Sequence, residues 1–385
     1  MPRGLALVFL VLLLAGCGGG GADGNGNGNG DFLVGAVEDS TRQPEAAAAK
    51  ERVQAVKDAG FDAIRITSIW TPGEREPKPE ELDVLRNVAE ASESLDIRLF
   101  IAVYQAGSAT TPRTESERAD FAAYAASLAR QLPTRDFIIG NEPNLNRFWM
   151  PQFGPGGEDV AAQDYQLLLA ESYDALKAVS DDVNVVGGAL APRGSDNPDL
   201  PRDTHSPTAF IRDLGTAYRQ SGRDKPIMDT LAYHPYETNS SVPPGNPHPN
   251  STTMTLGDYD RLRALLGEAF DDTAQEGTDL PILYTEFGVE SRIPPDKQSL
   301  YEGKEFPSVK PVSEDVQADH YVKAIDLAAC QETVIGILLF HVFDEIDLRG
   351  WQSGIRYVDD TPKKSYDRVK QAAEEARAGK VDCGG

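Results

Sequence analysis

The chain repeats one two-part unit eight times along its length, and this repetition limits the folds that are open to it. In each unit a short apolar run precedes a longer segment with apolar residues at three- and four-residue spacing. Alternating strands and helices predict a parallel sheet, and eight such units predict an α/β fold, a (β/α)8 TIM barrel in a single domain. The eight predicted strands are Phe32–Glu38, Ala63–Trp70, Arg98–Gln105, Phe137–Asn141, Val183–Leu190, Thr230–Tyr236, Ile282–Phe287 and Ile335–Phe343.

The segments that connect strands and helices are of unequal length. Helix-to-strand connections such as "DAGFD" and "LPTRD" are short. Strand-to-helix connections are long, as in "ETNSSVPPGNPHPNSTTMTLGD" after the sixth predicted strand and "VESRIPPDKQSLYEGKEFPSVKPVSED" after the seventh. Long irregular loops inside a compact domain are usually functional, and in a barrel the strand-to-helix loops meet at the C-terminal end. The pattern therefore predicts a functional site at that end.

Net charge narrows the range of partners. The 385 residues carry a formal net charge of −24, which argues against nucleic acid and against strongly anionic polymers. A neutral substrate is compatible with this charge. The alternative interpretation is that the acidic surface serves solubility alone.

The first thirty residues precede the first predicted unit. Residues 1–16 begin basic, continue apolar and end with small residues, as secretory signal peptides do. The run "LLLAGC" resembles the lipobox of bacterial lipoproteins. This resemblance implies lipidation of Cys17 and an extracytoplasmic protein that contacts the membrane through this anchor only, with an ordinary signal peptide as the alternative. Residues 17–30 are then a Gly/Asn-rich tether, and residues 31–385 form the barrel domain.

The other two cysteines, Cys330 and Cys383, remain as one possible pair. Export favours a disulfide between them. No Cys or His cluster has the spacing of a zinc site. We therefore expect a Cys330–Cys383 disulfide, and we expect neither a metal nor an organic cofactor.

Two glutamates follow apolar runs at the predicted functional end. Glu142 ends the fourth strand unit, and Glu286 lies in "PILYTEFG" on the seventh. A buried carboxylate costs free energy unless it is paired, hydrogen-bonded or used. These strands lie on opposite sides of a barrel, so the carboxylates face each other. Cleavage of a glycosidic acetal needs such a pair, one protonated and one ionised, whereas the alternative is a buried pair of structural use.

Three motifs on the fourth, sixth and seventh predicted strands resemble a known group of enzymes. The motifs "NEPNLNRFW", "AYHPY" and "YTEFG" resemble segments of clan A retaining glycoside hydrolases, and "TPKKSY" resembles the ends of those barrels. The β-xylosidase/α-L-iduronidase family is the most similar and the cellulase family is second. The resemblance covers roughly residues 31–379. It implies a retaining glycosidase that cleaves oligo- or polysaccharides by double displacement.

The resemblance also implies roles for individual residues. Glu142 is expected to be the general acid/base, Glu286 the nucleophile, and Asn141 a ligand of the sugar 2-hydroxyl. Arg65, in "FDAIRITSIW", is similar to an arginine that supports the nucleophile in those enzymes. A guanidinium keeps a nearby carboxylate ionised. The alternative for Arg65 is a salt bridge within the barrel wall.

Other residues complete the predicted carbohydrate site. Tyr236 is expected to donate a hydrogen bond to the nucleophile, and His234 to line the sugar site. The alternative for His234 is a satisfied structural histidine. Trp70 and Trp149 are candidate platforms for sugar rings.

The eighth predicted strand departs from the clan A pattern, which often places a tryptophan under the sugar. Candidate substitutes are Phe343, His341 and Trp351. Acidic rivals for the catalytic roles, none of them in a family motif, are Glu38, Glu290, Asp344 and Glu345. The alternative function is a non-catalytic extracytoplasmic carbohydrate-binding lipoprotein, and the presence of both glutamates in full motifs favours the enzyme.

Overall fold

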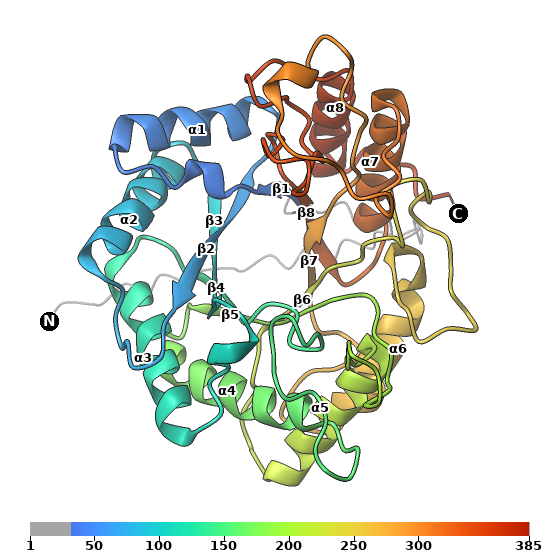
Figure 1. Ribbon diagram of the computed structural model, residues 1–385. Coiled ribbons are helices and arrows are strands. Elements are labelled where there is room, and N and C mark those ends of the chain that lie inside the picture. The colour runs from blue at the N-terminus through green and yellow to red at the C-terminus, as the bar shows by residue number, and fades with distance from the viewer. Residues whose placement is uncertain (1–31, 385) are drawn as a thin grey trace, which may run out of the picture.

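The computed structural model describes residues 32–384, which form a closed ring of parallel strands surrounded by helices (Figure 1). The strands are β1 (Leu33–Val37), β2 (Ala63–Trp70), β3 (Arg98–Gln105), β4 (Asp136–Ile139), β5 (Asn184–Leu190), β6 (Thr230–Tyr233), β7 (Ile282–Phe287) and β8 (Val334–Phe340). They pair in sequence order, and β8 pairs with β1 to close the ring. The predicted single-domain (β/α)8 barrel is confirmed.

A helix follows each strand within the described residues. These helices are α1 (Ala46–Asp58), α2 (Pro79–Ser94), α3 (Glu115–Gln131), α4 (Val160–Lys177), α5 (Pro207–Ser221), α6 (Tyr259–Phe270), α7 (Glu314–Ala329) and α8 (Tyr366–Arg377). Their ends carry residues that stabilise helix termini. Thr114 and Glu117 form a capping box at the start of α3. Helix α5 begins with the Ser206 cap and ends at Gly222 in the left-handed conformation.

The strands separate two apolar layers. Val34 and Ala36 of β1 point outward into the cluster between sheet and helices. Leu33 and Val37, which alternate with them, belong to a second cluster inside the barrel. Strands buried on both faces read as continuous apolar runs. This double burial explains why the strands could be recognised in the sequence.

Several strands are shorter than predicted, and the difference lies mainly at their C-terminal ends. β4 ends at Ile139 and β6 at Tyr233, so Asn141, Glu142 and His234 lie beyond the strand ladder. The apolar runs continue past these points because the loop starts are also buried, while the chain no longer pairs with its neighbours. The candidate site residues of the fourth and sixth units therefore begin loops.

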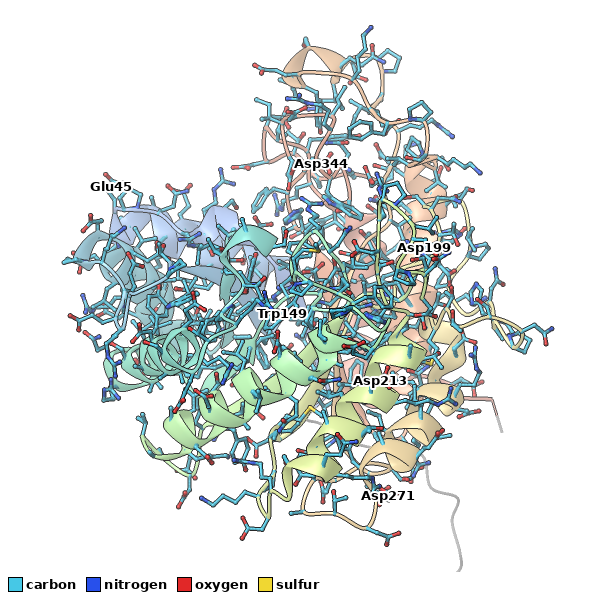
Figure 2. All side chains as sticks on the ribbon, turned by 60° about the horizontal axis from the view of Figure 1, so that its bottom comes forward. Glu45, Trp149, Asp199, Asp213, Asp271 and Asp344 are labelled. Atoms are coloured by element: carbon cyan, nitrogen blue, oxygen red, sulfur yellow. A yellow bond between two sulfur atoms is a disulfide. The ribbon has the colours of Figure 1, made fainter. Side chains whose placement is uncertain are left out.

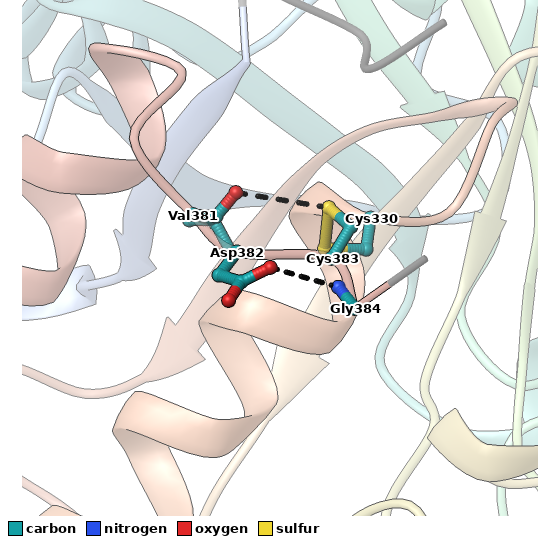
Figure 3. Close-up of a disulfide and its surroundings, with 5 residues drawn as sticks. All are labelled: Cys330, Val381, Asp382, Cys383 and Gly384. Atoms are coloured by element: carbon teal, nitrogen blue, oxygen red, sulfur yellow. Dashed lines mark hydrogen bonds between the residues drawn. A yellow bond between two sulfur atoms is a disulfide. The ribbon is translucent and has the colours of Figure 1, made fainter. Parts of the chain in front are cut away.

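The predicted cysteine partners are bonded to each other in the structure (Figure 3). Cys330 caps the C-terminal end of α7, and Cys383 follows α8. Their Cα atoms are 5.4 Å apart. The disulfide therefore fixes the C-terminal segment against α7.

The predictions on residues 1–31, the signal peptide, the lipidated Cys17 and the tether, lie outside the described residues. Within residues 32–384, no helix combines the length and the apolar character needed to cross a membrane.

Candidate active site

A cavity of about 720 Å³ opens at the C-terminal ends of the strands. Five of the predicted site residues, from four different strand units, are in its lining: Arg65, Asn141, Glu142, Tyr236 and Glu286. Part of the wall comes from the long loops after β6 and β7. Ser240 links these two loops, because its amide donates to the Val309 carbonyl and its hydroxyl accepts from the Glu290 amide. The long loops thus build the cavity.

The backbone around Glu142 is unusual and firmly held. Gly140 has a φ of +86°, and an added Cβ there would meet the Tyr165 ring at 2.9 Å. Glu142 itself has a φ of +42°, which is uncommon for a residue other than glycine. Its amide donates to the Ala189 carbonyl at 2.9 Å, so the turn is anchored to β5. Strained backbone conformations of this kind cluster at active sites and ligand-binding segments.

The second asparagine of the "NEPN" motif is structural. Asn144 is fully buried, and its amide nitrogen donates to the Ala191 and His205 carbonyls. Its carbonyl oxygen accepts from the Ala191 amide. Asn144 thereby joins the loops that follow β4 and β5 and fixes the course of the chain just after Glu142.

Arg65 connects two of the predicted catalytic-site residues. Its guanidinium, 1% exposed, forms an ion pair with Glu286 and also donates to the Asn141 side chain at 3.0 Å. Arg65 lies on β2, Asn141 after β4 and Glu286 on β7. The arginine thus holds the amide and the carboxylate in fixed relation on the floor of the cavity.

His234 lies between the two glutamates. Its Nδ1 is 3.1 Å from Oε1 of Glu142 and 3.5 Å from Oε2 of Glu286, and its side chain has no exposed area. The neighbouring Tyr236 hydroxyl donates to Oε2 of Glu286 at 3.1 Å, as predicted. His234 contacts both candidate catalytic carboxylates without lining the cavity.

The surroundings of Glu286 favour its ionised form. Burial by itself would raise the pKa of Glu286, but the nearby His234 and Arg65 charges and the hydrogen bonds from Arg65 and Tyr236 hold it below the usual range. A carboxylate kept ionised beside a cavity is suited to nucleophilic attack.

The two carboxylates are close to each other. A side-chain oxygen of Glu142, one of Glu286 and a ring nitrogen of His234 lie within 4.8 Å of one another. This trio is also the one group among the described residues with the spacing of a metal-ligand set. Sequence spacing does not indicate it, because Glu142 and His234 are 92 positions apart. The Arg65 charge beside Glu286 disfavours a divalent cation there.

The two tryptophans proposed as sugar platforms are core residues. Trp70 is 1% exposed, packs edge-on against Phe121 and donates to the Glu74 carbonyl. Trp149, which is labelled in Figure 2, is also 1% exposed and packs edge-on against Tyr165. Neither is in the cavity lining, so their placement does not support a sugar contact. Large aromatic rings are most often buried for packing.

A different set of aromatic rings faces the cavity. Trp351, from the loop after β8, lies 5.3 Å from the Tyr236 ring and 5.1 Å from the Phe340 ring, between ring centroids. All three line the cavity, as does His341. Of the candidate substitutes for the tryptophan that the eighth strand lacks, Trp351 and His341 therefore line the cavity. Phe343 does not, and its ring packs under Arg52.

The four rival acids differ in their surroundings. Glu38 accepts hydrogen bonds from the Val342 and Phe343 amides and thereby joins β1 to the loop after β8. Asp344 is buried against Lys363 at 2.7 Å. These two carboxylates have structural partners. Glu290 and Glu345 line the cavity, and burial raises the pKa of Glu290 to about 7.

Two arginines of the cavity lining were missed by the sequence analysis. Arg147 lies in the loop after β4 and Arg193 in the loop after β5. Arg147 lies within the "NEPNLNRFW" motif but was given no role there, and Arg193 belongs to none of the motifs. A loop arginine is ordinarily a solvated surface residue. Only the fold shows that both side chains reach the same cavity.

No protein-family model matches this chain, and no curated protein matches its sequence. Solved structures do match its fold. A GH5_18 enzyme of Streptomyces cattleya, in complex with GlcNAc, has a TM-score of 0.60 at 14% identity, over 90% of this chain and 80% of that one. A monomeric β-xylosidase of Caulobacter crescentus CB15 has a TM-score of 0.55 at 17% identity, over 88% and 67%.

The virulence factor SghA, in complex with its substrate analog salicin, has a TM-score of 0.56 at 14% identity. The match covers 90% of this chain and 96% of that one. At such low identities the likeness concerns the fold alone. The chain therefore has the barrel fold of glycoside hydrolases.

Proposed function

We propose that this protein is a retaining glycoside hydrolase with Glu286 as nucleophile and Glu142 as general acid/base. The observation that carries the proposal is the paired geometry of the two carboxylates: one oxygen of Glu142 lies within 4.8 Å of one oxygen of Glu286, and Arg65 is bound to Glu286. Retaining enzymes hold their carboxyl groups about 5–5.5 Å apart, whereas inverting enzymes need about 6.5–9.5 Å to admit a water. The close approach favours the retaining mechanism.

In the first step the Glu286 carboxylate attacks the anomeric carbon of the sugar. Arg65 and Tyr236 hold the attacking group ionised and oriented. At the same time Glu142 gives its proton to the glycosidic oxygen, the bond to the leaving group breaks, and a glycosyl ester forms on Glu286. The Asn141 amide nitrogen remains free to donate to the sugar 2-hydroxyl, because Arg65 engages only its oxygen.

In the second step a water molecule takes the place of the leaving group. Glu142, now ionised, accepts a proton from this water as it attacks the anomeric carbon, and the ester to Glu286 breaks. Two displacements at one carbon restore the original anomeric configuration. His234, 3.1 Å from Glu142, keeps this carboxyl in place through both proton transfers.

A panel of chromogenic aryl glycosides and oligosaccharides tests the proposal. We expect hydrolysis of at least one member, and proton NMR before mutarotation should show a product with the configuration of the substrate. An inverted product would refute the mechanism. Complete inactivity across a broad panel, together with sugar binding, would favour the alternative of a carbohydrate-binding protein.

Removal of the general acid provides a control for the assigned roles. The Glu142→Ala variant should lose least activity on substrates with good leaving groups, because these depart without protonation. Added azide should restore part of the rate by attacking the glycosyl ester. A variant whose loss is independent of the leaving group would contradict the role of Glu142.

We further propose that the barrel is tethered outside the cytoplasm through lipidated Cys17, on the basis of the lipobox-like run "LLLAGC". A Cys17→Ala variant should leave the membrane fraction, and unchanged fractionation would contradict the proposal. An oxidising location also accounts for a stable Cys330–Cys383 disulfide. Two reactive thiols in the unfolded, unreduced Cys17→Ala protein would contradict this second part.

A further inference from the structure

Two cationic side chains of the cavity have no anionic partner. Arg193 donates to the Tyr236 carbonyl at 3.3 Å and forms no ion pair with any residue in the described range. Arg147 lies over the Phe148 ring, 5.2 Å from its centroid, and likewise makes no ion pair among residues 32–384. They follow β4 and β5, which are neighbours in the barrel. Two guanidinium groups therefore enter one cavity from adjacent loops.

The position of Arg193 is unfavourable without a further partner. Burial lowers the pKa of Arg193, and the attraction of Glu142 and Glu237 opposes this effect. Burial also raises the pKa of Glu237 to about 7, so this neighbour is partly neutral near neutral pH. A partly desolvated charge is costly unless an opposite charge and hydrogen bonds accompany it. The unused donors of Arg193 are thus available to a ligand.

The two arginines lie on one side of the proposed catalytic centre. The Glu142 amide donates to the Ala189 carbonyl of β5, just before the loop that carries Arg193, and Arg147 lies in the loop that begins around Glu142. In the proposed reaction Glu142 protonates the oxygen of the leaving group. The arginines therefore face the part of the substrate that departs first.

We propose that the substrate carries an anionic group, a carboxylate or a sulfate, on the sugar residue that leaves, and that Arg193 binds this group with help from Arg147. This inference rests on the proposed glycosidase function. A guanidinium binds carboxylate and sulfate oxygens through two parallel hydrogen bonds. The net charge of −24 repels long anionic polymers, so a short oligosaccharide with a single charged group fits both the local and the overall charge.

Binding of matched, non-hydrolysable disaccharides tests the proposal. The probes are thio-linked glucosyl disaccharides whose reducing-end residue carries a hydroxymethyl group, a carboxylate or a 6-sulfate, and calorimetry with the full chain measures their affinities. We expect the parent protein to bind an anionic probe at least about tenfold more tightly than the neutral one, as charge-assisted hydrogen bonds predict. The more tightly bound anion identifies the natural group. Equal affinities, or no binding of any probe, would overturn the proposal.

Variants assign the preference to the arginines. Arg193→Gln should abolish the preference for the anionic probe over the neutral one. Arg193→Lys should keep part of this preference, and Arg147→Gln should reduce it. Glu237→Gln should increase it, because a competing negative charge is removed. Arg202→Gln is the matched control: Arg202 is exposed in the same loop as Arg193 but outside the cavity lining, so the preference should not change. An undiminished preference in a folded Arg193→Gln protein would overturn the assignment.

The proposed function and this inference fail in different ways. Hydrolysis of neutral aryl glycosides without any anionic preference would leave the glycosidase proposal intact and refute the anion site. Anionic preference without hydrolysis of any O-linked substrate would refute the glycosidase proposal.

Discussion

Two carboxylates at the C-terminal end of the barrel each face a buried cation, but their environments shift the pKa of the two acids in opposite directions. Glu286 pairs with Arg65, and its pKa is held below the usual range. Asp344, labelled in Figure 2, pairs with Lys363 at 2.7 Å, yet burial raises its pKa above the usual range. The presence of a cationic partner therefore does not decide the protonation behaviour of a buried acid.

The difference lies in how fully each pair is enclosed. Neither Lys363 nor Asp344 has an exposed side chain. The ammonium group of Lys363 donates hydrogen bonds to the Ser291 hydroxyl, the Asp344 carboxylate and the Gln352 carbonyl. The Glu286 side chain is 12% exposed and lines the cavity. Its Oε2 also lies 3.5 Å from Nδ1 of His234. One pair is closed and completed by the protein, whereas the other remains open to a ligand.

The closed pair is suited to holding loops together. Lys363 and Asp344 both lie in the loop between β8 and α8, and Lys363 also reaches Ser291 in the loop after β7. Tyr301, another residue of that loop, donates to Asp344 at 2.7 Å. Asp344 was a rival for the catalytic role, and its complete set of partners gives it a structural one instead.

The largest expected effect is on the open pair. Glu286→Gln should lower kcat by at least about 10⁴-fold on every substrate, because the covalent intermediate cannot form. The change is isosteric, and the side-chain oxygen of the glutamine can still accept from the buried Arg65, so the variant should stay folded. Steady-state kinetics and a thermal melt measure the two properties. Substantial residual turnover, with product retention unchanged, would exclude Glu286 as nucleophile.

Breaking the closed pair should affect stability instead. Lys363→Met leaves Asp344 buried without its cation, and such losses cost about 3–5 kcal/mol in the free energy of unfolding. Urea unfolding measures this cost. The fraction that remains folded should keep its kcat, because Lys363 does not line the cavity. A stable variant with impaired turnover would reverse the contrast between the two pairs.

Replacing both members of the closed pair should be milder than replacing one. In Lys363→Met combined with Asp344→Leu no unpaired charge is buried, and such apolar replacements are often close to neutral. The Tyr301 hydroxyl and the Gly354 amide lose their acceptor, so recovery should be partial, by about 1–3 kcal/mol relative to the single variant. A double variant no more stable than Lys363→Met would show that the ion pair itself contributes little.

The same contrast separates what the sequence could predict from what it could not. Eight doubly buried strands produce apolar runs that are visible without coordinates, so the barrel and its functional end follow from local pattern. Glu142 and Glu286 were identifiable because each interrupts such a run within a motif. The pairing of Arg65 with Glu286 is consistent with the predicted support of the nucleophile.

The direction in which individual side chains point could not be predicted from the sequence. Trp70 and Trp149 are indistinguishable from cavity residues by type and position, yet the fold turns both into the core. Arg193 lies in an irregular loop, and its entry into the cavity depends on contacts between loops such as those of Asn144. Contacts between residues far apart in the chain leave no periodic pattern.

The smallest expected effect concerns the hydrogen bond from Tyr236 to Glu286. The nucleophile must be ionised, so kcat/KM should fall as the pH drops through the pKa of Glu286, which is below the usual value of about 4.3. The Tyr236 hydroxyl stabilises the ionised form at 3.1 Å, and Tyr236→Phe removes this bond with little change of shape. The pKa of Glu286 should then rise, and the acidic limb of the pH–rate profile should move to higher pH.

Arg65 and His234 remain in place and contribute more to the lowered pKa of Glu286 than Tyr236 does, so the displacement of the acidic limb should be modest. Profiles of parent and variant on one aryl glycoside measure it, and an acidic limb that stays in place, or moves to lower pH, would show that Tyr236 does not stabilise the ionised nucleophile.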